Sequence, residues 1–273
     1  MIRRAVLTLV LLAAAAPALA CPLRLGDSAR QGALLIGRAE PGTRIAYEDT
    51  NLRVDPASGV FVFGIDRDAE GEAVLNVTCP DGADQPHRLV ILKREYDIER
   101  IDGLPEITVT PPKELWERIR REGAMIRSAR ARDTQTPRFL DGFIWPVVGR
   151  VSGRYGNQRI LNGKPRSPHL GIDIAAPAGT PVKAAAEGEV SLAEGDLFYT
   201  GGTIVIDHGH GVTTIYSHLK EVRVALGQKI SQGEVIGAVG TTGRVTGPHL
   251  DWRINWFQTR LDPALSVGPM PTN

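Results

Sequence analysis

The sequence predicts an all-β protein in which a small β-sandwich module and a short helical linker precede a compact antiparallel β domain. Three observations favour this fold class. Glycine (30) and proline (19) make up about 18% of the 273 residues, against roughly 12% in an average chain, which indicates many turns. Short apolar runs recur at intervals typical of strands. Only one segment has the length and spacing of a helix.

The first 20 residues have the features of a secretory signal peptide. Arg3 and Arg4 supply a positive n-region, Ala5–Ala16 is apolar with one exception, and residues 18–20 form a small-x-small cleavage site. The apolar run is shorter than the ~20 residues that span a bilayer, and no later segment approaches that length. We therefore expect an exported, periplasmic or cell-envelope protein without a transmembrane segment.

Cys21 directly follows the cleavage site, and Cys79 is the only other cysteine in the sequence. A cysteine at this position can be lipidated, but the lipidation signal usually has Leu three residues earlier, where this chain has Ala18. A disulfide between Cys21 and Cys79 fits an oxidising compartment. We favour the disulfide, with lipid anchoring at Cys21 as the alternative.

Residues 21–109 predict the small β-sandwich. Apolar runs at Val60–Phe63, Val74–Thr78 and Leu89–Leu92 are separated by turn signals such as Pro80-Asp81-Gly82. Strands of this length and spacing are typical of sandwiches. No group of ligand-type side chains gathers in this part of the sequence, so we expect a module that binds or spaces.

Residues 110–140 predict a linker that contains one helix. Pro111 and Pro112 break the strand pattern, and Glu114–Arg130 then carries an imperfect apolar stripe at helical spacing. Five arginines lie on the same segment. We expect a solvated linker helix, with contact to an anionic polymer as the alternative.

Residues 141–269 predict the antiparallel β domain. Apolar runs at Thr203–Asp207, Val212–Tyr216 and Val235–Val239 are joined by turns that contain glycine. No helical period of useful length occurs between residues 143 and 260. Five of the six histidines lie in this domain, so we expect the chemistry here.

The clearest local pattern begins at His249. His249, Asp251, Arg253 and Asn255 alternate with apolar residues, so the four polar side chains share one face of a strand. Trp252 lies on the opposite face and is expected in the core. His249 and Asp251, ~6.6 Å apart along the strand, are placed to converge on a metal or a substrate. Arg253 and Asn255 either bind substrate or form solvated or paired contacts.

A second pattern is the spacing His169-x-x-x-Asp173. In a straight strand these side chains would share a face but lie ~13 Å apart, too far to ligate one ion. Gly171 lies between them and permits the bend that would bring them together. His218 follows at the end of a later strand.

These segments resemble the lysostaphin/LytM-type zinc metallopeptidases. The resemblance rests on SPHLGIDIAAPAGTPV, GTIVIDHGHGVTTIYSHL and LGQKISQGEVIGAVGTTGRVTGPHLDW, which occur in family order between Trp145 and Pro263. It implies a LytM-like fold, with hairpins related to lipoyl and hybrid-barrel domains, and an enzyme that cleaves peptide bonds of bacterial peptidoglycan. Residues 21–140 lie outside the resemblance.

The resemblance also implies the site residues. His169 and Asp173 match two of the three zinc ligands of the family. His218 matches its catalytic histidine, and His249 matches the first histidine of its His-x-His motif, which assists the water activated by the metal. The second histidine of that motif, the third ligand, is Asp251 here. The resemblance therefore implies one Zn2+ held by His169, Asp173 and Asp251, with His218 and His249 as catalytic residues.

Asp251 changes the expected metal chemistry. Aspartate is an acceptable zinc ligand, and catalytic zinc sites need three protein ligands. Because a His/Asp/Asp set offsets both charges of a divalent ion, we expect a less acidic bound water, weaker zinc binding and tolerance of harder ions such as Mn2+. His210 is a rival ligand, since His208-Gly209-His210 is itself a His-x-His, but its place at a hairpin tip argues against it.

The function implied by the resemblance is that of an exported zinc-dependent endopeptidase, with peptidoglycan stem peptides as its partner and their cross-links as its target. The alternative is a catalytically inactive relative that binds and activates a cell-wall amidase. A biotinyl or lipoyl carrier is excluded because the lysine between methionines is missing. Lysine and arginine (32) nearly balance aspartate and glutamate (31), so we expect no nucleic-acid partner.

Overall fold

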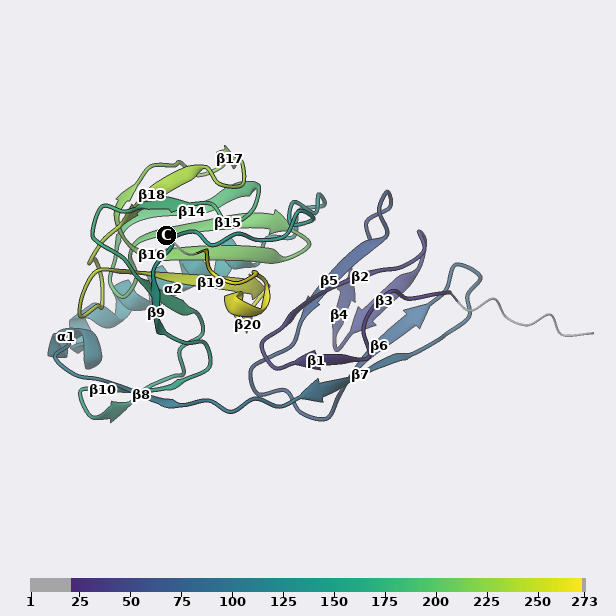
Figure 1. Cartoon of the computed structure of the whole chain (residues 1–273), viewed down its shortest axis with the longest axis horizontal. Helices are drawn as coiled ribbons and strands as arrows, with labels where there is room; N and C mark the ends of the chain where they lie inside the picture. Colours follow the sequence, from purple (N-terminus) through teal and green to yellow (C-terminus); the bar gives the residue numbers. More distant parts are fainter. Residues whose placement is uncertain (1–20, 272–273) are drawn as a thin grey trace, which may run out of the picture.

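The computed structural model describes residues 21–271, so the expected signal peptide lies outside the described residues. The chain forms two lobes that are joined by a long segment, residues 93–105, called the crossing segment below (Figure 1). Strands make up most of the regular structure, which confirms the all-β prediction. Within the described residues, no helix is long and apolar enough to cross a membrane.

The N-terminal lobe contains a five-stranded sheet with the order β1-β7-β6-β3-β4 and a two-stranded sheet of β2 and β5. Their bounds are β1 (Ser28–Arg30), β2 (Leu34–Arg38), β3 (Arg44–Tyr47), β4 (Thr50–Leu52), β5 (Val60–Gly64), β6 (Glu72–Thr78) and β7 (His87–Leu92). The two sheets share a core in which the rings of Tyr47 and Phe63 lie 4.9 Å apart. This is the sandwich-like arrangement that the alternating runs predicted.

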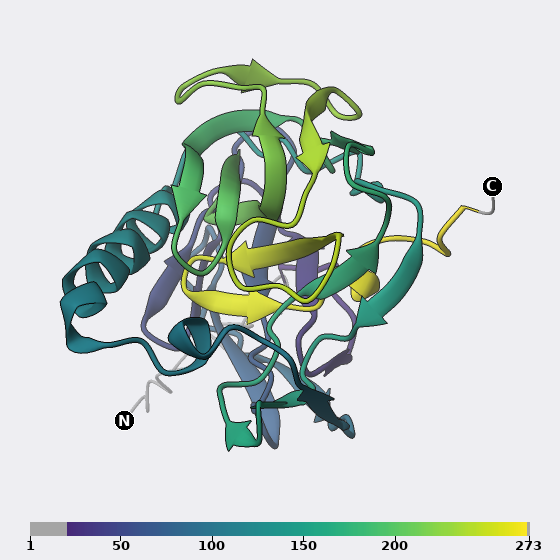
Figure 2. The same ribbon diagram turned by 90° about the vertical axis from the view of Figure 1, so that its left-hand side faces the viewer.

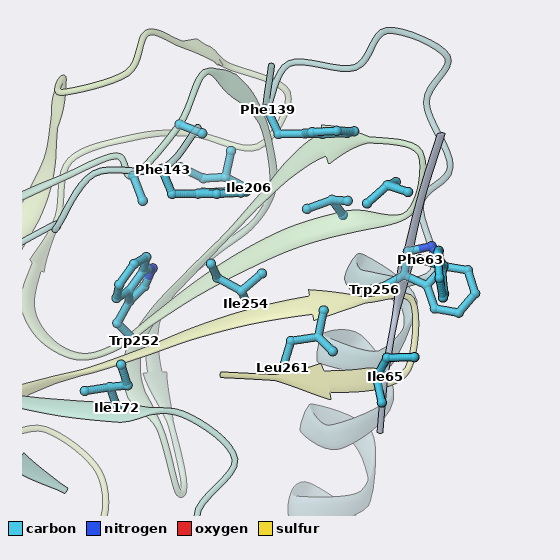
Figure 3. Close-up of a cluster of buried hydrophobic side chains, with 14 of the residues drawn as sticks. Phe63, Ile65, Phe139, Phe143, Ile172, Ile206, Trp252, Ile254, Trp256 and Leu261 are labelled. Atoms are coloured by element: carbon cyan, nitrogen blue, oxygen red, sulfur yellow. The ribbon is translucent and has the colours of Figure 1, made fainter. Parts of the chain in front are cut away.

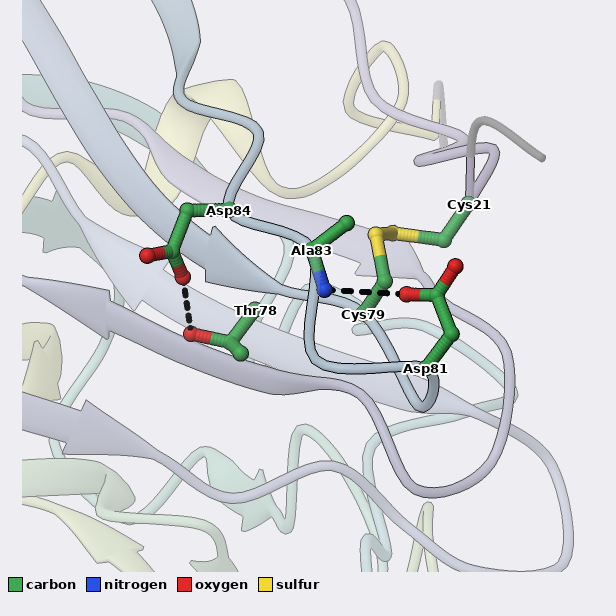
Figure 4. Close-up of a disulfide and its surroundings, with 6 residues drawn as sticks. All are labelled: Cys21, Thr78, Cys79, Asp81, Ala83 and Asp84. Atoms are coloured by element: carbon green, nitrogen blue, oxygen red, sulfur yellow. Dashed lines mark hydrogen bonds between the residues drawn. A yellow bond between two sulfur atoms is a disulfide. The ribbon is translucent and has the colours of Figure 1, made fainter. Parts of the chain in front are cut away.

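The disulfide between Cys21 and Cys79 is present (Figure 4). Both cysteines are buried, and the bond joins residues 58 positions apart in the sequence. In the turn after Cys79, the backbone N–H of Ala83 donates a hydrogen bond of 3.0 Å to Asp81. The disulfide therefore fastens the start of the described chain to the end of β6.

The crossing segment includes a strand that belongs to the C-terminal lobe. β8 (Ile98–Ile101) pairs in parallel with β10 (Gln158–Leu161), which also pairs with β11 (Lys164–Pro165). Residues 98–109 thus differ from the expectation that they form part of the sandwich. Ile101, Leu104 and Val109 pack with Leu161 in a small cluster, which gives this segment its apolar partners in the other lobe. α1 (Glu106–Val109) and η1 (Lys113–Leu115) follow β8.

The expectation of a solvated linker helix is wrong. α2 (Trp116–Arg130) packs against the C-terminal sheet (Figure 2). Ala129 of the helix is buried in a cluster that also contains Met125 and Ile126 and the strand residues Leu192, Leu197, Val205 and Ile215. Glu122 fixes the helix further, since its Oε2 accepts a hydrogen bond of 2.7 Å from the N–H of Phe198. The imperfect apolar stripe is wide enough for one buried side. Arg120, Arg121 and Arg127 are exposed, whereas Arg130 at the end of the helix is buried.

The C-terminal lobe is built on a ten-stranded sheet with the main order β17-β14-β15-β16-β19-β12-β9. β18 pairs with β13 and β16, and β20 pairs with β19. Residues 143–260 are all described and contain no helix, as predicted. The bounds are β9 (Arg150–Gly153), β12 (Ile172–Ala175), β13 (Pro181–Lys183), β14 (Gly188–Leu197), β15 (Gly201–Gly209), β16 (Val212–Val222), β17 (Lys229–Ile230), β18 (Val235–Val239), β19 (His249–Trp256), β20 (Thr259–Leu261) and η2 (Pro263–Leu265).

One hydrophobic core continues from lobe to lobe (Figure 3). Phe63 and Ile65 of the N-terminal lobe lie beside Trp256 and Leu261 of the C-terminal lobe. Gly64 allows this contact, because a Cβ there would lie 2.8 Å from a methyl carbon of Leu261. The shared core holds the lobes together at the Trp256 end of β19. The candidate site lies at the other end of that strand, at His249.

Candidate metal centre

Two neighbouring strands bring two of the candidate ligands to one place. β12 and β19 are antiparallel, with Asp173 directly opposite Asp251, and Ser217 of β16 faces Asp251 from the other side. Side chains of directly opposed residues lie on the same face, with Cβ atoms ~4.5–5.5 Å apart. Trp252 points the opposite way and is fully buried. The alternation predicted for this strand is confirmed.

His169 reaches the same place from the loop before β12. Its Nε2 lies 3.2 Å from Oδ1 of Asp173 and 3.8 Å from Oδ2 of Asp251. One potential ligand atom from each of the three residues lies within 4.8 Å of the others. Gly171 makes room for this arrangement, since a Cβ would lie 2.6 Å from Cγ of Arg253 and 2.8 Å from Oδ1 of Asp251. Its φ is not positive, so close approach rather than an unusual backbone angle requires the glycine.

Two of the potential metal-ligand atoms at this point are buried without a hydrogen-bond partner. They are Nε2 of His169 and Oδ1 of Asp173, and Nδ1 of His169 is a third such atom. Buried polar atoms are nearly always satisfied, so an orphaned imidazole nitrogen beside an orphaned carboxylate oxygen indicates a site for a cation. Histidine and aspartate are both ordinary zinc ligands. The residues present therefore fit a divalent metal ion.

Asp173 is kept charged and correctly oriented by its neighbours. Arg159 donates from Nη2 to Oδ2 of Asp173 at 2.6 Å and from Nε to Glu99 at 3.0 Å. This leaves Oδ1 of Asp173 for the site. Burial disfavours the charged carboxylate, but the charges of His169 and Arg159 outweigh it and lower the pKa of Asp173 to about 2. Asp173 is therefore a carboxylate at neutral pH.

Asp251 differs from the other two candidates because both of its oxygens are paired. Arg253 lies two residues further along the same face of β19 and donates from Nε to Oδ1 at 2.8 Å. Its Nη2 donates to Oδ2 at 2.5 Å. Burial opposes ionisation, yet the charge and hydrogen bonds of Arg253 hold the pKa of Asp251 well below its ordinary value. Arg253 is thus paired, one of the two roles that the sequence left open.

The pair has a consequence for the charge of the site. Taken alone, the His/Asp/Asp set offsets both charges of a divalent ion, as expected from the sequence. Arg253 cancels one of the two carboxylates. Asp251 and Arg253 together are net neutral, as is the imidazole that the resemblance implies for the third ligand. The premise for an unusually anionic ligand set is therefore removed.

His218 and His249 lie beside the candidate ligands, with ring centroids 4.8 Å apart. Nδ1 of His218 lies 2.9 Å from the carbonyl of Thr242, and Nδ1 of His249 lies 2.9 Å from the carbonyl of Gly247. Because a carbonyl only accepts, each Nδ1 carries the proton and each neutral ring keeps a lone pair on Nε2. Nε2 of His249 is 3.8 Å from Oδ1 of Asp173. Burial lowers the pKa of His218 to about 4, so this ring is neutral at pH 7.

The other two histidines of the domain lie elsewhere. His210 is in the turn between β15 and β16, where a hairpin tip was expected, and its Nε2 lies 2.9 Å from the carbonyl of Gln135. His208 is fully buried, with its ring nitrogens 2.6 Å from the carbonyl of Glu187 and 2.8 Å from Oγ1 of Thr214. Neither belongs to the cluster of candidate ligands.

The site opens into a cavity of about 530 Å3. Asp173, His218 and His249 line it together with Arg159, Arg244 and residues 99–102 and 104 of the crossing segment. The sequence did not predict that the crossing segment lines the cavity, because the pairing of β8 with β10 joins segments about 60 residues apart and has no local signal. Arg253 had a signal, since the alternation of β19 already placed it beside Asp251.

Comparison with known proteins shows which family this part of the chain resembles. The model of Peptidase family M23 matches residues 167–263. The peptidoglycan DD-endopeptidase ShyA of Vibrio cholerae is 42% identical over 106 residues, which are 38% of this chain and 24% of that protein. The DD-carboxypeptidase/endopeptidase Mpg of Neisseria meningitidis is 49% identical over 103 residues, again 38% of this chain and 24% of that protein. The chain thus spans about a quarter of the length of these relatives.

The fold similarity extends beyond the matched domain. A crystal structure of a Pseudomonas aeruginosa protein assigned to peptidase M23 superposes with a TM-score of 0.68 and 29% identity. It covers 88% of this chain and 94% of that one, so the likeness includes the N-terminal lobe. All five candidate site residues, His169, Asp173, His218, His249 and Asp251, fall within the segment that the family model matches. Residues 167–263, which hold the candidate site, are thus similar to Peptidase family M23.

Proposed function

We propose that the chain is an exported, zinc-dependent endopeptidase that hydrolyses peptide cross-links of bacterial peptidoglycan. The observation that carries this proposal is that two potential metal-ligand atoms, Nε2 of His169 and Oδ1 of Asp173, are buried beside Asp251 without a hydrogen-bond partner. Relatives named as peptidoglycan DD-endopeptidases support the substrate. They share the domain that holds the site.

Export is supported by the covalent chemistry of the N-terminal lobe. The disulfide between Cys21 and Cys79 is of a kind that forms and persists in oxidising compartments such as the bacterial periplasm. It agrees with the signal peptide expected over residues 1–20. A periplasmic location would give the cavity beside the candidate metal centre access to peptidoglycan.

His169, Asp173 and Asp251 would hold the ion. When bound, zinc would polarise the scissile carbonyl and lower the pKa of water. Arg159 supports this by fixing Asp173 with Oδ1 towards His169. Arg253 supports it by fixing Asp251 on the face of β19 that it shares with His249.

The proton transfers fall to His218 and His249. Their Nε2 lone pairs can accept a proton from the attacking water and return it to the leaving amine. Once protonated, either ring can donate a hydrogen bond to the carbonyl oxygen that gains negative charge. The carbonyls of Thr242 and Gly247 keep both rings in the tautomer that this requires.

A second candidate function is favoured by one specific contact. Both oxygens of Asp251 are engaged by Arg253, whereas a ligand must turn at least one lone pair to the ion. A chain whose third ligand stays engaged would be an inactive family member that binds and activates a cell-wall amidase. A carboxylate oxygen has two lone pairs, so the pairing and ligation by Asp251 are compatible, and we retain the endopeptidase as the main proposal.

The test is cleavage of isolated peptidoglycan by the purified mature chain. The protein is incubated with zinc or manganese, and released fragments are identified by mass spectrometry. Fragments with new amino and carboxyl ends are expected from the wild type and from His210→Ala, but not from His169→Ala. If the wild type releases nothing with either ion, the endopeptidase proposal is wrong. Stimulation of an added amidase by that same protein would then support the second candidate.

A further inference from the structure

One arginine side chain that lines the cavity beside the candidate metal centre has no acidic partner among residues 21–271. Arg244 lines the cavity together with His218 and His249. Arg159 lines it too, but its guanidinium is already paired with Glu99 and Asp173. Arg244 forms no such pair with any acidic side chain of residues 21–271; its one side-chain hydrogen bond there, at 3.4 Å, is to a backbone carbonyl.

The position of Arg244 is fixed by the loop that carries it. Its backbone N–H donates to the carbonyl of Tyr199 at 2.9 Å, and its guanidinium carbon lies 4.7 Å from the centroid of the Tyr199 ring. The preceding Gly243 has φ 76°, and a Cβ there would lie 2.5 Å from the same carbonyl. A guanidinium held in this way loses little freedom when it binds an anion.

The same loop orients a candidate catalytic residue. The carbonyl of Thr242 lies against Nδ1 of His218. Oγ1 of Thr242 accepts from the N–H of Gly202 and donates to the carbonyl of Leu219, both at 2.9 Å. Arg244 therefore lies two residues from the group that positions His218, on a loop held by the hydrogen bonds of Thr242 Oγ1 and of the Arg244 backbone N–H.

The surroundings of Arg244 favour an anion. Burial is the main cause that lowers the pKa of Arg244, and the positive charges of Arg159, Arg253 and Arg166 lower it further. The charged form of Arg244 is therefore disfavoured in free energy at this position. An anionic ligand would remove that cost. Arg100 also lines the cavity, but its side chain is exposed to solvent and is not held in the same way.

We propose that Arg244 is a specificity-determining residue that binds a free carboxylate of the peptide substrate beside the scissile bond. This deepens, and rests on, the proposed endopeptidase function. A guanidinium and a carboxylate form paired, charge-assisted hydrogen bonds, and Ile101, Leu104 and Leu161 on the cavity wall suit the aliphatic part of a peptide. The carboxylate belongs either to the C-terminus of a peptide stem or to a side chain, and the test distinguishes the two.

The experiment compares matched cross-linked peptides. One carries all carboxylates free, one has an amidated C-terminus, and one has an amidated side chain. Zinc-loaded wild type is expected to prefer the free acid over one of the two amides by about 10- to 100-fold in kcat/KM, mainly through KM. The amide that is discriminated against identifies the source of the carboxylate.

Variants assign the preference to Arg244. Arg244→Gln is expected to bring the ratio of free acid to amide close to 1, and Arg244→Lys to keep part of it, because lysine retains the charge but not the planar fork. Arg223→Gln is the matched control, since Arg223 is exposed and already paired with Glu221. It should keep the wild-type ratio.

The proposal is overturned if wild type cleaves free acid and amides equally well, or if Arg244→Gln keeps the wild-type ratio. If wild type cleaves none of the peptides, the endopeptidase function fails. Calorimetric binding of the same peptides then tests Arg244 alone. Wild type must bind the free acid at least ten-fold more tightly than the discriminated amide, and a folded Arg244→Gln must show no such difference. Equal binding overturns the inference independently of catalysis.

Discussion

Arg253 binds both carboxylate oxygens of Asp251, at 2.8 Å from Nε and 2.5 Å from Nη2, at the position where Peptidase family M23 is expected to have its third metal ligand. The side chain of Asp251 is only 3% exposed and that of Arg253 21%. A buried ion pair that loses one partner leaves an uncompensated charge, which costs far more than the net value of the pair. The aspartate and the arginine therefore act as one unit.

Asp251→His alone is expected to destabilise the protein. It leaves the guanidinium of Arg253 without its partner, for which a loss of about 3 kcal/mol in the free energy of unfolding is expected. The double variant Asp251→His/Arg253→Gln should recover most of that loss. Urea unfolding in the presence of a chelator measures the free energy of unfolding of both variants. Strictly additive effects of the two substitutions would show that Asp251 and Arg253 do not stabilise the protein as a pair.

The double variant should also bind zinc more tightly. It replaces an engaged carboxylate with a free imidazole and removes a cation from beside the ion. Competition with a chromophoric chelator is expected to show at least a ten-fold lower zinc dissociation constant than in the wild type. An unchanged or higher constant would mean that Arg253 does not compete with the ion for Asp251.

Gly171→Ala is expected to damage the site through steric contact. The new Cβ would lie 2.6 Å from Cγ of Arg253, 2.8 Å from Oδ1 of Asp251 and 3.0 Å from the carbonyl of Trp252. Overpacking of this kind costs about 1–3 kcal/mol, and zinc affinity should fall with it. Gly195→Ala is the matched control, because a Cβ there meets nothing within 4 Å. Equal behaviour of the two variants in urea unfolding and zinc titration would refute the close-approach role.

Loss of the disulfide is expected to lower stability without affecting the metal centre. The bond closes a segment of 58 residues, for which the chain-entropy model gives about 4 kcal/mol. The variant Cys21→Ser/Cys79→Ser should show this loss in urea unfolding. Its zinc affinity should equal that of the wild type, since the ligands lie in the other lobe. A matching drop in zinc affinity would mean that the lobes are coupled through the site.

Stability is expected to fall as the pH drops below 6.5. Burial lowers the pKa of His208 from 6.5 to about 4, so between these values the unfolded chain binds more protons than the folded one. The free energy of unfolding therefore decreases with falling pH across this window, by about 3 kcal/mol for this group. The nearby charges of Asp207 and Arg138 act in opposite directions on the same ring. His218, whose pKa burial also lowers to about 4, adds to the loss.

His208→Gln separates the two histidines. The variant should be less stable at pH 7, because it loses buried hydrogen bonds, but its stability should depend less steeply on pH between 6.5 and 4. Urea unfolding at a series of pH values, with a chelator present, measures the slope. A slope equal to that of the wild type would show that His208 does not titrate in this window.

Local periodicity accounts for what the sequence predicted well. The alternation from His249 to Trp256 placed Asp251 and His249 on one face, and the glycine in His169-Leu170-Gly171 marked the close approach of that loop. Each of these signals spans fewer than ten residues. They concern backbone geometry that neighbouring side chains determine.

Tertiary pairing accounts for what the sequence did not predict. The arginines of α2 suggested a solvated helix, yet Ala129 is buried because β14 and β15 supply an apolar surface that only the folded sheet presents. Likewise, Glu99 contacts Arg159 because β8 and β10 pair across about 60 residues. No local pattern encodes either contact.

The measurement that tests the central claim most directly is the zinc content of purified residues 21–273 after equilibrium dialysis at micromolar free zinc. The wild type and His210→Ala are expected to contain one zinc per chain, and His169→Ala none. Asp251→Ala should retain less than the wild type. A wild type without zinc, or a His169→Ala variant that contains as much zinc as the wild type, would contradict a metal centre formed by His169, Asp173 and Asp251.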